Sequence, residues 1–320
     1  MAALWDAQII QIVDLKQVQA EVFEPILEAE TGVWREQLHW DFHSSAELVR
    51  RFISMHALSG VSLTLNGRPV GYSYYVCEDR KGLIGDLFVL EEYRSAENEG
   101  RLLGAILQAL VQSPYVKRIE SQLMMMRSAV PTQLPHTRFL RTYERDFMLA
   151  DLSGAAGLPA GSSGGRLLFE NWSEERQDEA AYLIASAYDG HVDSEINDQY
   201  RSISGARRFL TNIVQYPGCG SFWQPASWIA LHEGRVCGIS LASLVASDVG
   251  HITQICVAPE VQGTGAGYEL LRHSLRSLAA KGCQEVTLTV TSSNHRAIRL
   301  YEHVGFRTLR RFSACVWEGF

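Results

Sequence analysis

Residues 252–271 of the chain read ITQICVAPEVQGTGAGYELL. The stretch opens with apolar and β-branched residues typical of a strand, passes Pro259, which ends the ladder of hydrogen bonds, and then places three glycines within five positions. An amphipathic pattern follows and predicts a helix. Glycine lets a ligand approach the backbone closely, and the free amides and dipole of the helix attract anions, above all phosphate. The alternative interpretation is a turn that only changes the direction of the chain.

The sequence patterns of two familiar phosphate-binding loops do not match this loop. A P-loop needs lysine followed by serine or threonine after its last glycine, but Gly267 is followed by Tyr268 and Glu269. A dinucleotide-binding fingerprint needs its third glycine where Tyr268 stands. Residues 262–267 (QGTGAG) instead match the pattern Gln/Arg-x-x-Gly-x-Gly/Ala. Here the sequence resembles the GNAT superfamily of N-acetyltransferases, in which this loop holds the pyrophosphate of acetyl-CoA.

A second stretch resembles the same superfamily. Residues 286–290 (VTLTV) predict a buried strand and lead into residues 293–306 (SNHRAIRLYEHVGF). The latter match the pattern Asn-x-x-Ala-Ile-x-Leu-Tyr-x-x-x-Gly-Phe, which follows the glycine loop in members of the superfamily. The two matches occur in the expected order and spacing, so the resemblance implies the superfamily's fold for this part of the chain.

Composition narrows the classes of function. The 320 residues carry a net charge of −7 and are 46% hydrophobic, which is typical of an ordinary globular protein of two domains. Lysine and arginine form no basic run, so nucleic acid is not an expected partner. No apolar segment reaches the roughly 18 residues of a membrane span, and no leader is visible, so we expect a cytoplasmic protein without a membrane partner. The scattered cysteines predict free thiols and no metal site.

The chain contains an internal repeat. Residues 85–89 (GDLFV) align with 253–257 (TQICV), and residues 67–71 (GRPVG) align with 234–238 (GRVCG). Between the copies, residues 153–165 are rich in Gly, Ser, Ala and Pro and predict a flexible linker. We therefore expect a domain over 1–152, a linker over 153–165 and a domain over 166–320. The resemblance implies an α/β (α+β) fold in which each domain is a mixed, mostly antiparallel twisted sheet flanked by helices.

The two copies are not equivalent. Where the second has its glycine loop, the first has residues 94–100 (RSAENEG), with Glu97 and Glu99 where a pyrophosphate would bind. Carboxylates at the start of a helix repel an anion. The first domain is therefore interpreted as a degenerate copy that completes the acceptor groove or an interface.

The resemblance implies direct transfer of an acetyl group from acetyl-CoA, as co-substrate, to an amine. Tyr301 is the candidate general acid for the leaving thiolate, because a phenol can protonate a thiolate without a large pKa shift. Cys256 is interpreted as a packing residue rather than a nucleophile, and Asn294 as a hydrogen-bond partner of the cofactor or as a helix cap. The implied cofactor-binding residues are Ile255, Cys256, Val257, Gln262, Gly263, Thr264, Gly265, Ala266, Gly267 and Asn294.

The general base is less well defined by the sequence. Many members of the superfamily carry an acidic residue where this chain has Gln254, and some carry a glutamate where it has Thr289. His251, Asp248 or a chain of water molecules are the remaining candidates, and His251 is the one selected. Residues 188–195 (YDGHVDSE) are expected on the acceptor side, with carboxylates that either bind a cation or cap a helix.

The expected acceptor is a small-molecule amine, since the departures at residues 254 and 289 weaken a peptide assignment. A catalytically silent, CoA-binding sensor or interaction protein is the first alternative. An acetyltransferase of protein lysines or N-termini is the second. A second copy of the same chain, in a homodimer, is the candidate protein partner.

Overall fold

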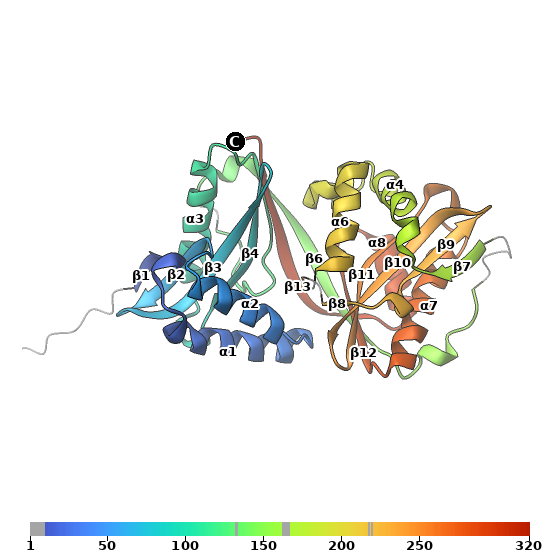
Figure 1. Ribbon diagram of the computed structural model, residues 1–320, viewed down its shortest axis with the longest axis horizontal. Helices are drawn as coiled ribbons and strands as arrows, with labels where there is room; N and C mark the ends of the chain where they lie inside the picture. The colour runs from blue at the N-terminus through green and yellow to red at the C-terminus, as the bar shows by residue number, and fades with distance from the viewer. Residues whose placement is uncertain (1–9, 132–133, 162–166, 217, 219) are drawn as a thin grey trace, which may run out of the picture. The chain divides into compact units, whose positions relative to one another are not determined.

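The computed structural model describes residues 10–131, 134–161, 167–216, 218 and 220–320. The chain forms two compact units (Figure 1). The first comprises the chain up to Tyr143 together with Phe312–Phe320, and the second comprises Glu144–Arg311. Each unit is a mixed sheet with helices packed on it, as the sequence predicts.

In the first unit the strands follow the order β1-β2-β3-β4-β5-β13. Neighbouring strands are antiparallel except β4 and β5, which are parallel. The strands are β1 (Ile10–Asp14), β2 (Gly60–Leu65), β3 (Arg68–Glu78), β4 (Lys81–Val89), β5 (Arg118–Gln122) and β13 (Arg307–Glu318). The helices are α1 (Ala20–Leu38), α2 (His43–Ser54) and α3 (Ala96–Gln112).

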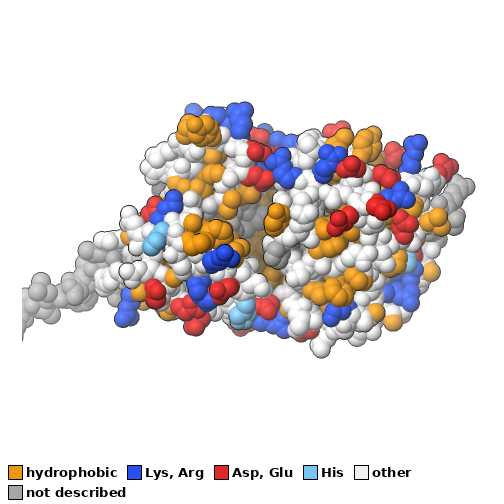
Figure 2. Space-filling model, in the orientation of Figure 1, with side chains coloured by type: hydrophobic (Ala, Val, Ile, Leu, Met, Phe, Trp, Pro, Cys, Tyr) orange, Lys and Arg blue, Asp and Glu red, His pale blue; other side chains and the backbone are white. Residues whose placement is uncertain are grey.

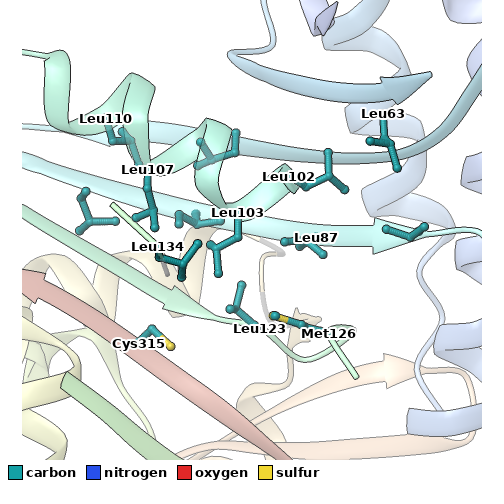
Figure 3. Packing of buried hydrophobic residues seen from close by; sticks show 14 of the residues in the cluster. Leu63, Leu87, Leu102, Leu103, Leu107, Leu110, Leu123, Met126, Leu134 and Cys315 are labelled. Atoms are coloured by element: carbon teal, nitrogen blue, oxygen red, sulfur yellow. The ribbon is translucent and has the colours of Figure 1, made fainter. Parts of the chain in front are cut away.

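Helix α3 provides much of the first unit's core. Its leucines and isoleucine recur at helical spacing and form one apolar face, while Ser95 caps its start by accepting a hydrogen bond from the amide of Asn98 at 3.2 Å. Figure 3 shows this face packed against side chains from the sheet and from the chain beyond β5. The labelled members are Leu63, Leu87, Leu102, Leu103, Leu107, Leu110, Leu123, Met126, Leu134 and Cys315.

In the second unit the strands follow the order β6-β12-β11-β10-β9-β7, with β8 paired to β10. Neighbouring strands are again antiparallel except for one parallel pair, β11 and β12. The strands are β6 (Leu140–Asp151), β7 (Leu167–Asn171), β8 (Ser221–Phe222), β9 (Trp228–His232), β10 (Arg235–Ala246), β11 (Val249–Val257) and β12 (Glu285–Thr291). The helices are α4 (Gln177–Ala187), α5 (Val192–Ile196), α6 (Ile203–Gln215), α7 (Ala266–Lys281) and α8 (His295–His303).

Helices cover the second sheet through two separate apolar clusters. Leucines of α7 pack with Ile252 and Leu288 of the sheet, whereas α4 and α6 pack with Ile239 and Leu241. Successive residues of a strand point to opposite faces, so α7 lies on one face of the sheet and α4 and α6 lie on the other.

The two units share details that support the repeat seen in the sequence. The β2–β3 turn has Asn66 at φ 49° and Gly67 at φ 81°, and the β9–β10 turn has Glu233 at φ 50° and Gly234 at φ 77°. Both central residues of each turn are left-handed, which is the geometry of a type I′ hairpin. The parallel pairs β4–β5 and β11–β12 also correspond.

The last strand of each half of the sequence pairs with the sheet built by the other half. Strand β6, from the first half, is antiparallel to β12, and Met148 lies in the core of the second unit. Strand β13, at the end of the chain, is antiparallel to β5, and Cys315 and Trp317 lie in the core of the first unit. The unit boundaries therefore fall at 143/144 and 311/312, whereas the sequence suggests a boundary between 152 and 166.

The segment expected to be a flexible linker packs on the second unit as far as it is described. Ala155 is buried in the α7 cluster, and Leu158 packs beside it. The hydroxyl of Tyr268 donates to the carbonyl of Pro159 at 2.8 Å, and the amide of Gly161 donates to the Glu269 carboxylate. Small and apolar side chains thus attach this stretch to α7. Residues 162–165 of the expected linker lie outside the described residues.

The surface shows no single-signed charge stripe on the face seen in Figure 2, where Lys and Arg side chains are interspersed with Asp and Glu. Among the helices of the described residues, none combines the length and apolar composition that a membrane span requires.

The exchange of strands predicts where core mutations act. Met148→Ala should speed amide hydrogen exchange in β11 and β12, and Trp317→Ala should do so in β4 and β5, each with a loss of about 2–5 kcal/mol in unfolding free energy. Hydrogen-exchange mass spectrometry of both variants measures this directly. The two variants are controls for each other, and an effect of Met148→Ala centred on β4 and β5 would contradict the exchange.

Candidate functional site

Strands β11 and β12 separate partway along their length. Their parallel pairing runs from Val249 opposite Glu285 to Ile252 opposite Leu288 and then stops. A bulge lies at this point, because Leu241 of β10 pairs with residue 254 while the next residue of β10 pairs with Ile252. Beyond the bulge β11 continues along β10 alone, while β12 continues along β6. Within the described part of the chain, the β12-facing side of Ile255, Cys256 and Val257 has no paired strand, so it can accept an extended ligand.

The glycine loop lies where β11 ends. Gly263 and Gly265 have φ values of 82° and 89°, which other residues adopt only with strain, and Gly265 immediately precedes α7. Gln262, Gly263 and Thr264 are exposed, and the first amides of α7 lack partners within the helix. Ala266 is buried in the first turn of α7, and a Cβ atom at Gly267 would meet Val257 and Leu300 at van der Waals distance. The loop therefore has the form of an anion site.

Charges around the loop favour an anion. Arg296, at the start of α8, donates to the Gln262 side chain at 2.6 Å and lies beside Gly263. Glu269, in the first turn of α7, is buried. Burial acts to raise its pKa, but hydrogen bonds from Arg272 and the Gly161 amide outweigh this and lower it. Arg272 thus balances the charge of Glu269. The cation beside the loop, Arg296, was not predicted from the sequence.

The corresponding place in the first unit is filled by the chain itself. Glu99 is 1% exposed, and its carboxylate accepts from the amides of Arg127 at 3.1 Å and Ser128 at 2.9 Å. Arg94 donates to the carbonyl of Val89, the last residue of β4, at 2.9 Å. The first unit therefore satisfies internally the groups that the second unit leaves open.

Tyr301 lies on α8 and is only 6% exposed. Burial raises the pKa of its phenol, the charge of Asp193 raises it further, and Arg145 acts in the opposite direction. The phenol therefore keeps its proton at all ordinary pH values. Its ring packs against Phe306, with 5.9 Å between the ring centroids, in the apolar cluster of α7.

Asp193 of α5 is the centre of a polar network that links three elements. Its carboxylate accepts from the hydroxyl of Thr291 on β12, lies 3.5 Å from Arg145 Nη1 on β6, and lies 3.7 Å from His191 Nδ1. His191 caps α5, since its Nδ1 accepts from the Asp193 amide at 3.1 Å. The expected alternative role of Asp193 as a helix cap therefore belongs to His191.

Asn294 caps α8 and also reaches this network. Its Oδ1 accepts from the amide of Ala297 at 3.2 Å, and its Nδ2 lies 3.4 Å from His191 Nε2. Its position at the start of α8 thus places the amide between the helix and His191.

Two tyrosines line the opposite side of β11 from α7. Tyr188 and Tyr200 stack at 4.4 Å between ring centroids. Gln254 bridges them, because its Nε2 donates to Tyr188 at 2.9 Å and its Oε1 accepts from Tyr200 at 3.1 Å. Gln254, at the position where many members of the superfamily carry an acidic residue, therefore has a neutral hydrogen-bonding role.

Cys256 faces the same side and is a packing residue. It packs with the apolar cluster of α4 and α6, and burial raises the pKa of its thiol to about 12. Such a thiol is not ionised near neutral pH, so the geometry supplies no nucleophile here.

His251 lies deeper in the sheet. It is 7% exposed, its Nδ1 lies 2.8 Å from the Thr287 hydroxyl, and its ring stacks on Phe147. Burial lowers its pKa to about 4. A group this weakly basic is a poor acceptor for the proton of an amine.

Trp223 and Trp228 both contact α7. Lys281 lies over the Trp223 ring at 5.3 Å, and the Trp228 indole donates to Ser277 at 3.2 Å. Both tryptophans are thus engaged by α7. Over the described residues, no group of three or more His, Cys, Asp or Glu side chains is placed to hold a metal ion.

Residues 194–306 match the profile of the Acetyltransferase (GNAT) family. The chain is 28% identical over 123 residues to N-alpha-acetyltransferase MAK3 of Arabidopsis thaliana, covering 38% of this chain and 59% of that protein. It is 34% identical over 86 residues to a mycothiol acetyltransferase of Thermomonospora curvata, covering 27% of this chain and 29% of that protein. The chain thus spans well under two thirds of either relative.

The fold resembles that of a solved tandem GNAT protein from the clavulanic acid biosynthesis pathway. The TM-score is 0.58 at 16% identity, and the match covers 97% of this chain and 98% of the other. At this identity the likeness concerns the fold, and it extends over both units.

The burial of His251 predicts a pH-dependent stability. Its pKa is lower in the folded chain than the ordinary value of 6.5, so the unfolded chain binds more protons below pH 6.5. Stability should fall as pH decreases from about 6.5 to 4, by up to about 3 kcal/mol for this group. Urea unfolding of the wild type and His251→Gln between pH 4 and 7.5 measures the difference.

The control for this experiment is His303→Gln, which alters an exposed histidine. Its pH dependence should match that of the wild type. An unchanged slope in His251→Gln would show that His251 does not titrate as its burial implies.

Proposed function

Because this chain belongs to the GNAT acetyltransferase family, we propose that its second unit transfers an acetyl group from acetyl-CoA to the primary amine of a small molecule. The observation that carries the proposal is the separation of β11 from β12 beside a helix that starts with left-handed glycines. An extended ligand with an anionic end fits such a place. The buried phenol of Tyr301 feels the charges of Asp193 and Cys256, so we place it near the same opening.

The residues of the second unit fit acetyl-CoA as follows. The loop Gln262, Gly263, Thr264, Gly265, Ala266 and Gly267 would hold the pyrophosphate through its amides, with Arg296 adding a charge. The main chain of Ile255, Cys256 and Val257 would pair with the pantetheine arm. Asn294 would contact the cofactor and would also hold the ring of His191 in place. We propose that the first unit binds no acetyl-CoA, because Glu99 and Arg94 occupy its equivalent groups.

Tyr301 is the proposed general acid. Its raised pKa keeps the phenol protonated, so that it can donate to the thiolate that leaves when the amine attacks. His251 is buried and too weakly basic for the general base, and the Nδ1 of His191 already accepts from the Asp193 amide, so that its neutral ring carries the proton on Nε2. We propose that a chain of water molecules takes the amine proton.

A peptide or protein N-terminus is the second candidate acceptor, and the similarity to an N-alpha-acetyltransferase favours it. Gln254 in place of an acid supports a third reading, a unit that binds acetyl-CoA without turnover. A panel of small amines and N-terminal peptides separates these functions. Peptide turnover without amine turnover would refute the small-molecule assignment.

Cofactor binding is tested by titration calorimetry with acetyl-CoA. The wild type should bind at one site, and Gly265→Glu should weaken binding roughly 10- to 100-fold, through backbone strain and charge repulsion at the loop. Gly282→Glu is the matched control, since Gly282 ends the same helix with φ at 102°. Two sites in the wild type would show that the first unit also binds acetyl-CoA. Equal losses of affinity in Gly265→Glu and Gly282→Glu would show that strain in the helix, rather than the loop, causes the loss.

Catalysis is tested with Tyr301→Phe. Loss of a general acid typically costs about 10²–10⁴-fold in rate, so kcat should fall within that range while the affinity for acetyl-CoA stays close to that of the wild type. Tyr182→Phe, on the exposed side of α4, is the control and should retain full activity. Full activity of Tyr301→Phe would refute the role of Tyr301 as general acid. A wild type that binds acetyl-CoA but acetylates no amine or peptide would favour the catalytically silent binding protein.

A further inference from the structure

Arg145 is a charged side chain at the site that the proposed reaction does not use. It lies on β6, opposite Thr291 of β12, and is therefore carried to the second unit by the first half of the sequence. Its side chain is only 13% exposed. A guanidinium that far removed from water needs compensation by charge or by hydrogen bonds.

The chain supplies that compensation only in part. The ion pair with Asp193 is long, at 3.5 Å, and the same Asp193 oxygen already accepts the hydroxyl of Thr291. The Nε of Arg145 is buried and has no acceptor among the described residues. An arginine has five donors arranged for a planar, two-oxygen partner, so one loose contact leaves most of its capacity unused.

The position of Arg145 suits a contact with the acceptor rather than with the phosphates of the cofactor. It lies 3.5 Å from Asp193, which accepts from Thr291, and Thr291 lies on β12 beyond Leu288, the last residue that pairs with β11. The pyrophosphate loop has its own cation in Arg296, which contacts Gln262. The rest of the acceptor side near β11 is neutral, with Tyr188, Tyr200 and Gln254 hydrogen-bonded to each other.

A fixed positive and a fixed negative group side by side complement a zwitterion. On the basis of the proposed acetyl transfer, we propose that the acceptor is an amino acid or a similar amine with a neighbouring carboxylate, and that Arg145 binds that carboxylate. Asp193 and His191 then face the amine, and Arg145 holds the carboxylate away from the route of attack. A carboxylate is the planar partner that a guanidinium binds best.

The test uses matched pairs of amines with and without a carboxylate: L-phenylalanine and phenethylamine, L-histidine and histamine, and L-lysine and cadaverine. For the wild type, kcat/KM should be roughly 10- to 100-fold higher for the preferred amino acid than for its decarboxylated partner. Arg145→Gln should remove most of this preference by raising KM for the amino acid, with little change for the amine. Arg145→Lys should restore part of it.

Arg311→Gln is the control variant. Arg311 donates to Asp146, the neighbour of Arg145 on β6, at 2.8 Å, but its side chain is 62% exposed. It should leave the preference unchanged. An equal loss of turnover on both members of a pair in Arg145→Gln would show a structural ion pair and overturn the inference.

Other outcomes separate the inference from the proposed function. If the wild type acetylates the amines as well as the amino acids, the carboxylate assignment fails and the acetyl transfer stands. If it acetylates only amines or peptides without a neighbouring carboxylate, the assignment also fails. If it binds acetyl-CoA and acetylates nothing in the panels, both the assignment and the transferase function fail.

Discussion

The antiparallel pairing of β6 with β12 is the contact on which the second unit depends. It covers the side of β12 that faces away from β11, and it places Met148 in the core of this unit. It also lets β12 extend to Thr291 after β11 has turned away, because β12 then has a partner on its other side. Without this pairing the end of β12 would be an unpaired strand, and the opening beside β11 would lack a wall.

Strand β6 contributes side chains both to the buried interior and to the polar network around Asp193. Arg145 and Phe147 point to the face of the sheet on which His251 and Asp193 lie. Phe147 closes over His251 and removes it from water, whereas Arg145 faces the partly open network of Asp193 and His191. One strand thus contacts both a buried histidine with a structural role and the polar network around Asp193.

Local patterns in the sequence predicted much of the fold and the strand, glycine loop and helix over residues 252–271. The glycines of residues 262–267, the turn at Gly234 and the motif around Tyr301 are short-range signals, since each reflects the backbone conformation of its own neighbourhood. The repeat also identified two units. The polar network of Arg145, His191 and Asp193 was not predictable in the same way, because pairing between distant strands brings these residues together. Nor did a lone histidine in a strand reveal that Phe147 and Thr287 would enclose His251.

The exchange of β6 and β13 has a consequence for synthesis on the ribosome. The second unit can complete its sheet as soon as β12 emerges, because β6 is by then already made. The first unit cannot, since β5 waits for the final strand of the chain, some 190 residues later. Until β13 has emerged, β5 presents an open strand edge and the leucines of α3 lack Trp317. The unit that is translated first is therefore the one that finishes folding last.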